Sequence, residues 1–383
     1  MRILYDDQGF FEHHGGVSRY FTEIMKHFPK GFEYVLPLVS TSNEYLRKEP
    51  FNIPSHKQDV NDFIRDWCHG CCFPGVSRVY RLCARLMPRV FPSGELANIR
   101  KVRKAVHDGD FDVFHLTGPH WIRDDWKMIV DKKPIVVTVH DLIPELFYGS
   151  KRTMRCRRQL LKVSAHIIAV SENTKRDVMS LYGTPEEKIS VIYHGYLPQK
   201  NFVPLKDQPP DPYVLYVGKR NGYKNFQFLI KAITPLLKRK KLMLFCTGSP
   251  FSSEELSLFD SLGVADRVVQ RFVSDEELTA LFRDAVAFVY PSIYEGFGIP
   301  ILDAFSAGCP VVLSQTSCFP EVAGDAALYF EKDDAATLYN HIESLMGDEG
   351  IRQGLIQKGH DRIKMFSWDR CACETAKVYM SLK

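Results

Sequence analysis

The sequence predicts an α/β protein built from two doubly wound domains, each with a parallel sheet covered by helices on both faces. Three observations lead to this prediction. The chain has 383 residues, which exceeds the ~250 residues at which single hydrophobic cores stop growing. Short apolar runs alternate with charged amphipathic segments, as is typical of a parallel sheet between helices. A proline-rich polar stretch divides this alternation into two similar series.

The first series begins with an apolar run over 2–6, followed by a glycine turn at Gly15-Gly16 and a helix-like segment over 17–28. This order of strand, glycine turn and helix is typical of a Rossmann-like domain. The other expected strands of this half are 34–39, 113–116, 135–139, 167–170 and 189–192. We predict that the N-terminal domain spans residues 1–197.

The alternation stops over 198–212, which we interpret as an interdomain linker stiffened by prolines. These prolines are Pro198, Pro204, Pro209, Pro210 and Pro212. The expected strands of the second series are 213–217, 242–246, 268–269, 286–289 and 311–313, with helices near 334–347 and 350–365. We predict a second Rossmann-like domain over 213–366 and a last helix within 367–383. Two such domains facing across a cleft bind ligands at the carboxyl ends of their strands.

Composition narrows the class of protein. Hydrophobic residues make up 45% and charged residues 25% of the chain, as in ordinary globular proteins. The formal net charge of +4 gives no strong field toward nucleic acid, so we expect no nucleic-acid partner. Asp6 and Asp7 interrupt the first apolar run, and no later run reaches the ~18 residues of a membrane helix. We therefore expect a cytoplasmic protein.

The sequence offers no convincing metal motif. Its ten cysteines are expected to be reduced, because a chain of this length without a secretory signal does not need disulfides. Cys68, Cys71 and Cys72 lack the second ligand pair of a zinc site. The letters of a DxD motif occur at Asp108-Gly109-Asp110, but in a polar turn before a strand, which favours a solvated loop. We predict no metal and no other cofactor.

The most informative segment is 291–304, which follows an expected strand and opens a helix. Gly296 and Gly298 let the backbone approach a ligand, and the following helix N-terminus favours a phosphate. Phe297 lies between the two glycines. Of the two carboxylates Glu295 and Asp303, one can hold sugar hydroxyls while the other holds ribose hydroxyls. A helix cap with a solvated acid is the weaker interpretation of this pattern.

This segment resembles the EX7E signature of the retaining glycosyltransferase family 4, which has the GT-B fold. The resemblance implies a nucleotide-sugar donor bound mainly by the C-terminal domain and an acceptor on the N-terminal side. It also implies that the anomeric configuration is retained. Asp303 stands where the family usually has Glu. The resemblance extends over nearly the whole chain, except for residues from about 40 to 110.

A second segment, 217–225, places several cations in a glycine-containing turn after a strand. Such cations suit a diphosphate whose charge grows as the glycosidic bond breaks, although a solvated basic turn is the alternative. The segment resembles the diphosphate-binding loop of the family. This resemblance implies that Arg220 and Lys224 neutralise the leaving group. Lys219 occupies the place where many members carry the arginine, so both neighbours stay candidates.

Two loops of the first half complete the expected site. Gly15-Gly16 resembles the family's GG loop, whose amides approach the donor phosphate and the acceptor. His140 follows a strand, and the resemblance implies that it hydrogen-bonds the transferred sugar or positions the acceptor. Asp141 either orients the imidazole or caps the next helix.

Four further segments resemble the family less specifically. Ser171 lies in a segment near the cleft or caps a helix, and His194 precedes Gly195 where Asn-Gly is common. Glu321 is implied to hold loops in place. The run 366–368 resembles the start of a final helix that crosses back onto the first domain.

We expect a front-face mechanism, in which the leaving phosphate helps to deprotonate the acceptor, because no nucleophile is evident. A paired-carboxylate glycosidase mechanism is disfavoured, since Glu295 and Asp303 are expected to hold the donor. The acceptor is expected to be a glycan or lipid-linked glycan. Two basic segments, 78–89 and 151–162, either attract an anionic membrane at its inner face or are solvated helix faces.

Two rival functions stay open: a GT-B nucleotide-sugar epimerase, and a non-catalytic protein that binds sugar nucleotides or glycans. A dinucleotide dehydrogenase is disfavoured, because no GxGxxG follows the first strand. Resemblance of 222–225 and 140–145 to mannosyltransferase-like members favours mannose from GDP-mannose.

Overall fold

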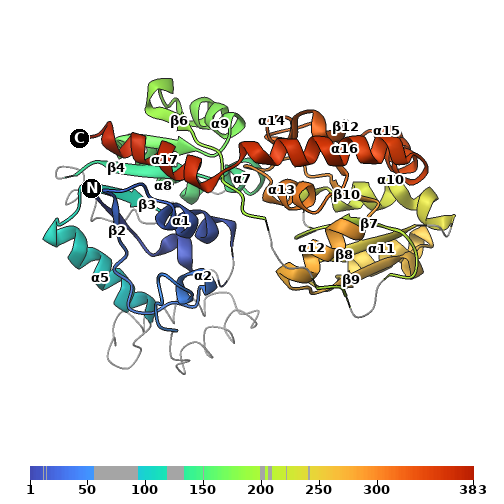
Figure 1. Cartoon of the computed structure of the whole chain (residues 1–383), viewed down its shortest axis with the longest axis horizontal. Helices are drawn as coiled ribbons and strands as arrows, with labels where there is room; N and C mark the ends of the chain where they lie inside the picture. The colour runs from blue at the N-terminus through green and yellow to red at the C-terminus, as the bar shows by residue number, and fades with distance from the viewer. Residues whose placement is uncertain are drawn as a thin grey trace.

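The computed structural model contains two six-stranded parallel sheets, each formed by one half of the chain (Figure 1). It describes residues 1–11, 13, 15–55, 94–118, 133–149, 151–198, 203–205, 209–220, 222–239 and 242–383. The cysteine cluster at 68–72 and the basic segment 78–89 lie outside these residues.

The N-terminal sheet has the strand order β2-β1-β3-β4-β5-β6. Its strands are β1 (Arg2–Tyr5), β2 (Glu33–Val35), β3 (Val113–Leu116), β4 (Ile135–Val139), β5 (His166–Ala169) and β6 (Ile189–Val191). Between them lie η1 (Gln8–Phe10), α1 (Gly16–Lys26), α2 (Glu44–Arg47), α5 (Gly94–Asp108), α7 (Ile143–Phe147), α8 (Lys151–Val163), α9 (Glu172–Tyr182) and η2 (Glu186–Lys188). Successive residues of a strand point to opposite faces, and α5, α8 and α9 pack on one face while α1 packs on the other.

The C-terminal sheet has the order β12-β11-β10-β7-β8-β9. Its strands are β7 (Tyr213–Tyr216), β8 (Met243–Thr247), β9 (Val268–Arg271), β10 (Ala287–Tyr290), β11 (Val311–Ser314) and β12 (Ala327–Phe330). The short helices are η3 (Gly222–Lys224), η4 (Ala265–Arg267), η5 (Gly324–Ala326) and η6 (Ile363–Met365), and the longer ones are α10 (Phe226–Lys238), α11 (Ser253–Leu262), α12 (Asp275–Asp284), α13 (Ile299–Ser306), α14 (Phe319–Ala323), α15 (Ala335–Gly347) and α16 (Glu349–Arg362). The apolar residues of α12, α13 and α14 cover one face, and those of α10, α11 and α15 cover the other.

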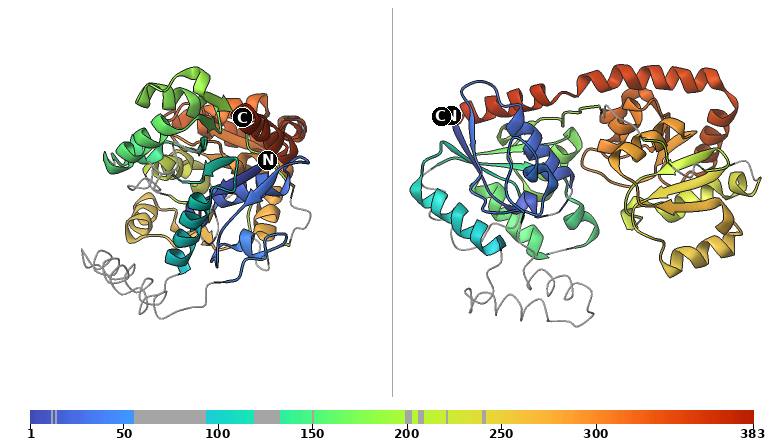
Figure 2. Two further views of the ribbon diagram at one scale, coloured as in Figure 1. Left: turned by 90° about the vertical axis from the view of Figure 1, so that its left-hand side faces the viewer. Right: turned by 60° about the horizontal axis from the view of Figure 1, so that its bottom comes forward.

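The last helix, α17 (Trp368–Met380), packs on the N-terminal domain beside α1. Its buried residues, among them Trp368 and Tyr379, belong to the same apolar cluster as Ile3 and Phe21. Figure 2 shows α16 and α17 running along one side of both domains, and both chain termini at the same end of the molecule. The N-terminal domain is therefore completed by residues from the far end of the chain.

Two chain segments cross between the domains, and they touch each other. The backbone N–H of Tyr196 donates to the carbonyl of Phe366 at 3.2 Å. A Cβ on Gly195 would lie only 2.3 Å from the backbone nitrogen of Trp368, so this close approach requires glycine. Residues near 195 and near 367 thus form a paired connection between the two domains.

Strand β12 is absent from the strands expected from the sequence. It is a four-residue strand at the edge of the sheet, and its middle residues, Leu328 and Tyr329, are only partly buried. The run of apolar residues that could have predicted this strand is therefore short. Among the described residues, no helix is long and apolar enough to span a bilayer.

Candidate active site

The loops after β4 and β10 meet where the two domains touch. A Cβ on Gly296 would lie 1.7 Å from the carbonyl oxygen of His140, so only glycine lets the two backbones approach this closely. Thr174 of α9 adds a hydroxyl that donates to the carbonyl of Gly296 at 3.4 Å. The segment predicted to bind the donor therefore faces the loop predicted to contact the transferred sugar.

Glu295 and Lys224 form an ion pair in this region, with 2.6 Å between Nζ and Oε1. Both side chains are largely buried, at 10% and 13% exposed respectively. Ser317 holds the backbone of Glu295, because its Oγ accepts from the Glu295 N–H and donates to the Glu295 carbonyl. The structure thus brings together the predicted sugar-binding acid and one predicted diphosphate-binding cation.

Arg220 lies in a different environment. Its guanidinium donates through Nε to Glu255 at 2.7 Å and through Nη2 to the carbonyls of Ser249 and Pro250. Its Nη1 atom is buried and has no partner among the described residues. Lys219, its neighbour, is exposed. Arg220 is held by the start of α11, so its role toward a diphosphate stays a prediction.

The helix after the Glu295 loop begins as expected. Gly298 is the N-cap of α13 and has a φ of 92°, a conformation that favours glycine. Pro300 lies in the first turn, where its missing N–H costs no helical hydrogen bond. Phe297 turns inward and stacks on His194, with ring centroids 4.7 Å apart. The loop is therefore anchored between the domains by its aromatic residue.

Asp303 lies on α13, one turn beyond Ile299. Burial raises the pKa of its carboxyl group to about 6, while Arg19 and the hydroxyl of Tyr196 act in the opposite direction. The side chain is ionised above that pH and can then accept hydrogen bonds from hydroxyl groups.

Gly15 and Gly16 stand at the start of α1, with Gly15 as the N-cap. A Cβ on Gly16 would lie 3.7 Å from Cδ1 of Ile299, so the start of α1 faces the start of α13. The Gly15 carbonyl accepts from the hydroxyl of Ser18 at 3.0 Å. The predicted glycine loop of the first domain therefore lies against the predicted donor loop of the second.

His140 is enclosed by aromatic rings. Tyr20 packs edge-on against it with centroids 4.9 Å apart, and Phe21 and His194 lie within 6 Å. Burial lowers the pKa of His140 to about 3, so the imidazole is neutral near pH 7. Its Nε2 atom is buried without a partner among the described residues. This nitrogen has hydrogen-bonding capacity left for a ligand.

Asp141 serves the local backbone: its Oδ1 accepts from the N–H of Ile143 at 3.0 Å. Ile143 is the first residue of α7, but the N-cap of that helix is Leu142 and no side chain caps it, so both roles considered for Asp141 stay predictions. Behind His140, a buried set of hydrogen bonds joins Tyr20 to Thr138, Thr138 to His115 and His115 to Tyr379 of α17. The sequence did not reveal this set, because its members are far apart in the chain.

Glu321 joins the two domains. Its carboxylate accepts from the backbone N–H groups of Glu172 and Asn173 at the start of α9, at 2.9 and 3.2 Å. An acid at this helix end also interacts favourably with the helix dipole. Nearby, the hydroxyl of Tyr294 donates to Asp177 at 2.7 Å. The implied role of Glu321 in holding loops agrees with these contacts.

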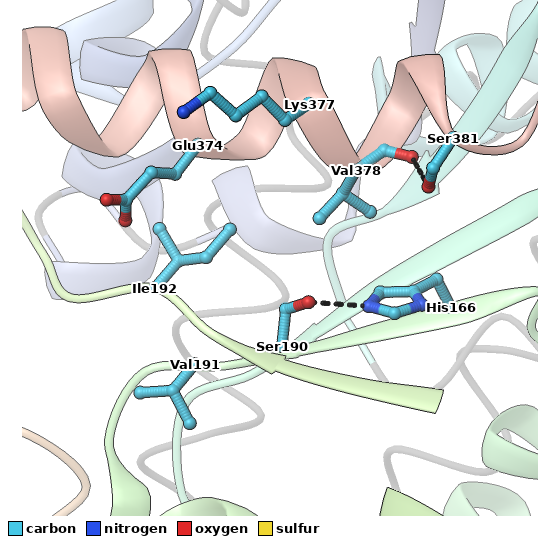
Figure 3. Close-up of a pocket in the computed structure, with 8 residues that line it drawn as sticks. All are labelled: His166, Ser190, Val191, Ile192, Glu374, Lys377, Val378 and Ser381. Atoms are coloured by element: carbon cyan, nitrogen blue, oxygen red, sulfur yellow. Dashed lines mark hydrogen bonds between the residues drawn. The ribbon is translucent and has the colours of Figure 1, made fainter. Parts of the chain in front are cut away.

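Other features lie away from this region. A pocket of about 330 Å³ is lined by β5, β6 and α17. Figure 3 shows Glu374 and Lys377 on α17 and the hydrogen-bonded His166 and Ser190 on the strands below that helix. No predicted site residue lines this pocket. Asp110 pairs with Arg2, and Asp108 pairs with Lys104, as expected of surface acids. No group of three or more potential metal ligands is found among the described residues.

Solved structures share this architecture. The structure of HepE from Anabaena in complex with UDP-glucose matches with a TM-score of 0.70 at 18% identity, over 100% of both chains. Sucrose-phosphate synthase from Thermosynechococcus elongatus matches with a TM-score of 0.67 at 17% identity, over 100% of this chain and 98% of that one. The fold is therefore that of the two-domain GT-B glycosyltransferases.

Sequence comparison identifies the family. The model for Glycosyltransferase Family 4 matches residues 14–199, and the model for Glycosyl transferases group 1 matches 199–362. O-antigen chain mannosyltransferase B of Escherichia coli is 30% identical over 64% of this chain and 70% of its own length. O-antigen chain mannosyltransferase RfbU of Salmonella typhimurium is 32% identical over 55% of this chain and 60% of its own length. The chain belongs to glycosyltransferase family 4 and is an enzyme of that class.

Proposed function

We propose that the protein transfers a hexose, with retention of configuration, from a nucleotide diphosphate sugar to a glycan or lipid-linked glycan acceptor. GDP-mannose is the proposed donor. The names of the Escherichia coli and Salmonella relatives support mannose, and so does the resemblance of 222–225 and 140–145 to mannosyltransferase-like members.

The observation that carries this proposal is the buried pair of Lys224 and Glu295 beside the backbone of His140. One domain supplies a cation and an acid, and the other supplies a neutral imidazole. Together these groups can bind a substrate in which a sugar is joined to a phosphate. The phosphate side needs positive charge, and the sugar side needs hydrogen-bonding groups.

The donor is proposed to bind along the start of α13. Lys224 and the positive end of the α13 helix dipole stabilise the diphosphate as it departs, with Arg220 adding positive charge through its unpartnered Nη1. Glu295 accepts from the sugar hydroxyls, and Asp303 accepts from the ribose hydroxyls. Because these groups stabilise the negative charge of the departing diphosphate, we propose that the reaction needs no metal ion.

Transfer is proposed to occur on one face of the sugar. The bond between the anomeric carbon and the phosphate oxygen breaks, and the acceptor oxygen bonds to the same face of that carbon. The acceptor proton passes to an oxygen of the departing phosphate. Neutral His140 hydrogen-bonds the sugar through Nε2 and orients it, without exchanging a proton in the cycle.

The acceptor is proposed to approach over α7 and α8. Phe147 packs on Tyr223 and Tyr294, which flank Lys224 and Glu295, with centroids 5.2 and 6.0 Å away. Tyr148 is 59% exposed beside it. Among the described side chains of the adjoining helix, the exposed cations are Lys151, Arg155, Arg158 and Lys162. Apolar and cationic side chains together suit a lipid diphosphate or the anionic inner face of the cytoplasmic membrane.

A thermal-shift panel with GDP, UDP, ADP and their sugar conjugates tests the donor. A ligand at 100 times its Kd stabilises the protein by about 2.7 kcal/mol, which appears as a rise of a few degrees in Tm. We expect GDP and GDP-mannose to give the largest rise. A selective response to UDP would overturn the choice of donor, and no response to any nucleotide would overturn the proposed function.

Two further measurements test the mechanism and the membrane contact. NMR of the product should show the anomeric configuration of the donor, and mass spectrometry should find no covalent glycosyl adduct on the enzyme. Sedimentation with anionic vesicles should weaken when Arg155 and Arg158 are replaced by Gln. Unchanged sedimentation would remove the membrane contact from the proposal.

A further inference from the structure

Two neighbouring loops of the C-terminal domain leave the sheet side by side. Strands β10 and β11 pair in parallel, with Tyr290 opposite Leu313, so the loops that follow them start at the same edge of the sheet. Beyond the strands the ladder of backbone hydrogen bonds ends, and the backbone groups there need other partners. The loop after β10 carries Glu295, so the partners of its backbone decide where that carboxylate lies.

Side chains from the end of β11 and the loop after it supply these partners. Ser314 donates through Oγ to the carbonyl of Ser292. Thr316 donates through Oγ1 to the carbonyl of Ile293 at 3.1 Å. The backbone that leads from β10 to Glu295 is therefore bonded at successive positions by hydroxyl groups of the neighbouring loop.

Ser317 makes the next of these contacts, and it bonds both backbone groups of one residue. Its Oγ donates to the Glu295 carbonyl at 2.5 Å and accepts from the Glu295 N–H at 3.2 Å. The thiol of Cys318 reaches the same carbonyl at 3.3 Å. Rotation of Glu295 about its backbone bonds would break these contacts, so they fix the direction in which its carboxylate meets Lys224.

The backbone of Ser317 is strained. Its φ of 54° lies in the left-handed region, which residues with a side chain rarely adopt and which glycine occupies without steric cost. Elsewhere in the described part of the chain, the residues other than glycine with a positive φ are Asn52 and Asn225, and asparagine tolerates this region. A serine held in a conformation that suits glycine indicates that its hydroxyl is needed.

We propose that Ser317 is a positioning residue that sets the direction of the Glu295 carboxylate and thereby the recognition of the transferred sugar. The inference rests on the proposed function, in which Glu295 accepts from the sugar hydroxyls. Ser317 acts through Glu295 and not by contact with the donor. Hydrogen bonds weaken as their angle departs from linear, so a rotated carboxylate loses the sugar hydroxyls while the nucleotide keeps its own partners.

Ser317→Gly separates the hydroxyl from the strain, because it removes the first and relieves the second. The effect is measured by calorimetric titration of the intact protein with GDP and with GDP-mannose, and by transfer kinetics with GDP-mannose. We expect GDP to bind as it does to the wild type. The ratio of the affinity for GDP-mannose to that for GDP should fall by about 10-fold, as for a lost charge-assisted hydrogen bond. The kcat should fall by about 100-fold, as for a displacement of about 1 Å.

Two further variants distinguish the hydroxyl from the backbone. Ser317→Ala loses the same hydrogen bonds but keeps a side chain at the positive φ, so it should share the kinetic defect and have a lower Tm than Ser317→Gly. Ser317→Cys keeps a weaker donor at the same place, and its kcat should lie between those of the wild type and Ser317→Gly. An equal Tm for Ser317→Gly and Ser317→Ala would show that this residue carries no strain, which would remove the reason for assigning its hydroxyl a role.

The matched control is Asn52→Gly, which also replaces a residue of positive φ, 51°, at an exposed position of the N-terminal domain. It should keep the wild-type kcat and both affinities. If Ser317→Gly keeps the wild-type kcat and the wild-type preference for GDP-mannose, the inference is wrong. It is also wrong if Ser317→Gly loses affinity for GDP as strongly as for GDP-mannose, because Ser317 would then support the whole nucleotide site. If the wild type binds no nucleotide, the proposed function itself fails, which is a distinct result.

Discussion

The two domains contribute to the candidate site in different ways. In the C-terminal domain, Lys224, Glu295 and Ser317 lie on neighbouring loops of one continuous stretch of chain and bond directly to one another. In the N-terminal domain, His140 is enclosed by rings from α1 and from the segment near 194. The comparison teaches that the C-terminal part of the candidate site is held by direct bonds between polar side chains, whereas the N-terminal part is held by the packing of aromatic rings from segments far apart in the chain.

The cores repeat this difference. Both apolar clusters of the C-terminal sheet consist largely of residues between 213 and 366. One cluster of the N-terminal sheet instead combines Tyr20 and Phe21 of α1 with Trp368 and Tyr379 of α17. The N-terminal domain therefore needs the end of the chain for its stability, and the following variants test the contrast.

Glu295→Gln should have the largest effect on catalysis. The amide keeps the shape of the side chain but removes the negative charge paired with Lys224, and we expect kcat to fall by about 100- to 1000-fold. Transfer assays with GDP-mannose, alongside Tm, measure this. Glu343→Gln, which breaks the exposed pair with Arg239, is the matched control and should keep full activity. Retention of activity in Glu295→Gln would contradict the site.

Trp368→Ala should destabilise the N-terminal domain selectively. Removing a buried Trp costs about 3–5 kcal/mol, and this side chain packs in the cluster that contains α1. Hydrogen exchange should accelerate in α1 and β1 but not in α10 or β8. Met380→Ala, on the same helix at a 53% exposed position, should leave exchange unchanged. Equal acceleration in both domains would remove the contrast between their cores.

Gly296→Ala tests the contact between the domains. The added methyl group would lie 1.7 Å from the carbonyl oxygen of His140, so the loops must separate. A displacement of about 1 Å can lower a rate by roughly 100-fold, and we expect this in kcat with a smaller change in nucleotide affinity. Gly354→Ala on α16 meets nothing within 4 Å and should stay active, with stability raised by up to ~1 kcal/mol.

Asp6→Asn should have the smallest effect, seen only in the pH dependence of stability. Burial raises the pKa of Asp6 to about 7, so the folded state keeps a proton that the unfolded state has released. The proton on Asp6 contributes stability that is fully present below the pKa of this group in the unfolded chain. That contribution is lost as the pH rises toward 7. Between pH 6 and 7 the wild type should lose up to about 1 kcal/mol that the variant does not. Parallel denaturation curves for both proteins would contradict this.

Most of the fold could be predicted from periodicity, because buried parallel strands appear as short apolar runs between amphipathic segments. β12 could not, since it is a partly exposed edge strand. Glu295 and Lys224 could be identified because each follows a strand at the carboxyl edge of one sheet. The buried hydrogen bonds that join Tyr20, Thr138, His115 and Tyr379 could not, because these residues are far apart in the chain and form no local pattern.

Sequence alone therefore determined the two α/β domains, the family and the loops that carry the candidate donor site, because these depend on residue types at short spacing. Only the tertiary structure decided that Arg220 pairs with Glu255, that α17 completes the N-terminal core and that Gly296 touches the backbone of His140. These contacts join residues far apart in the chain. Their formation is governed by packing and by competition between partners, which local patterns do not encode.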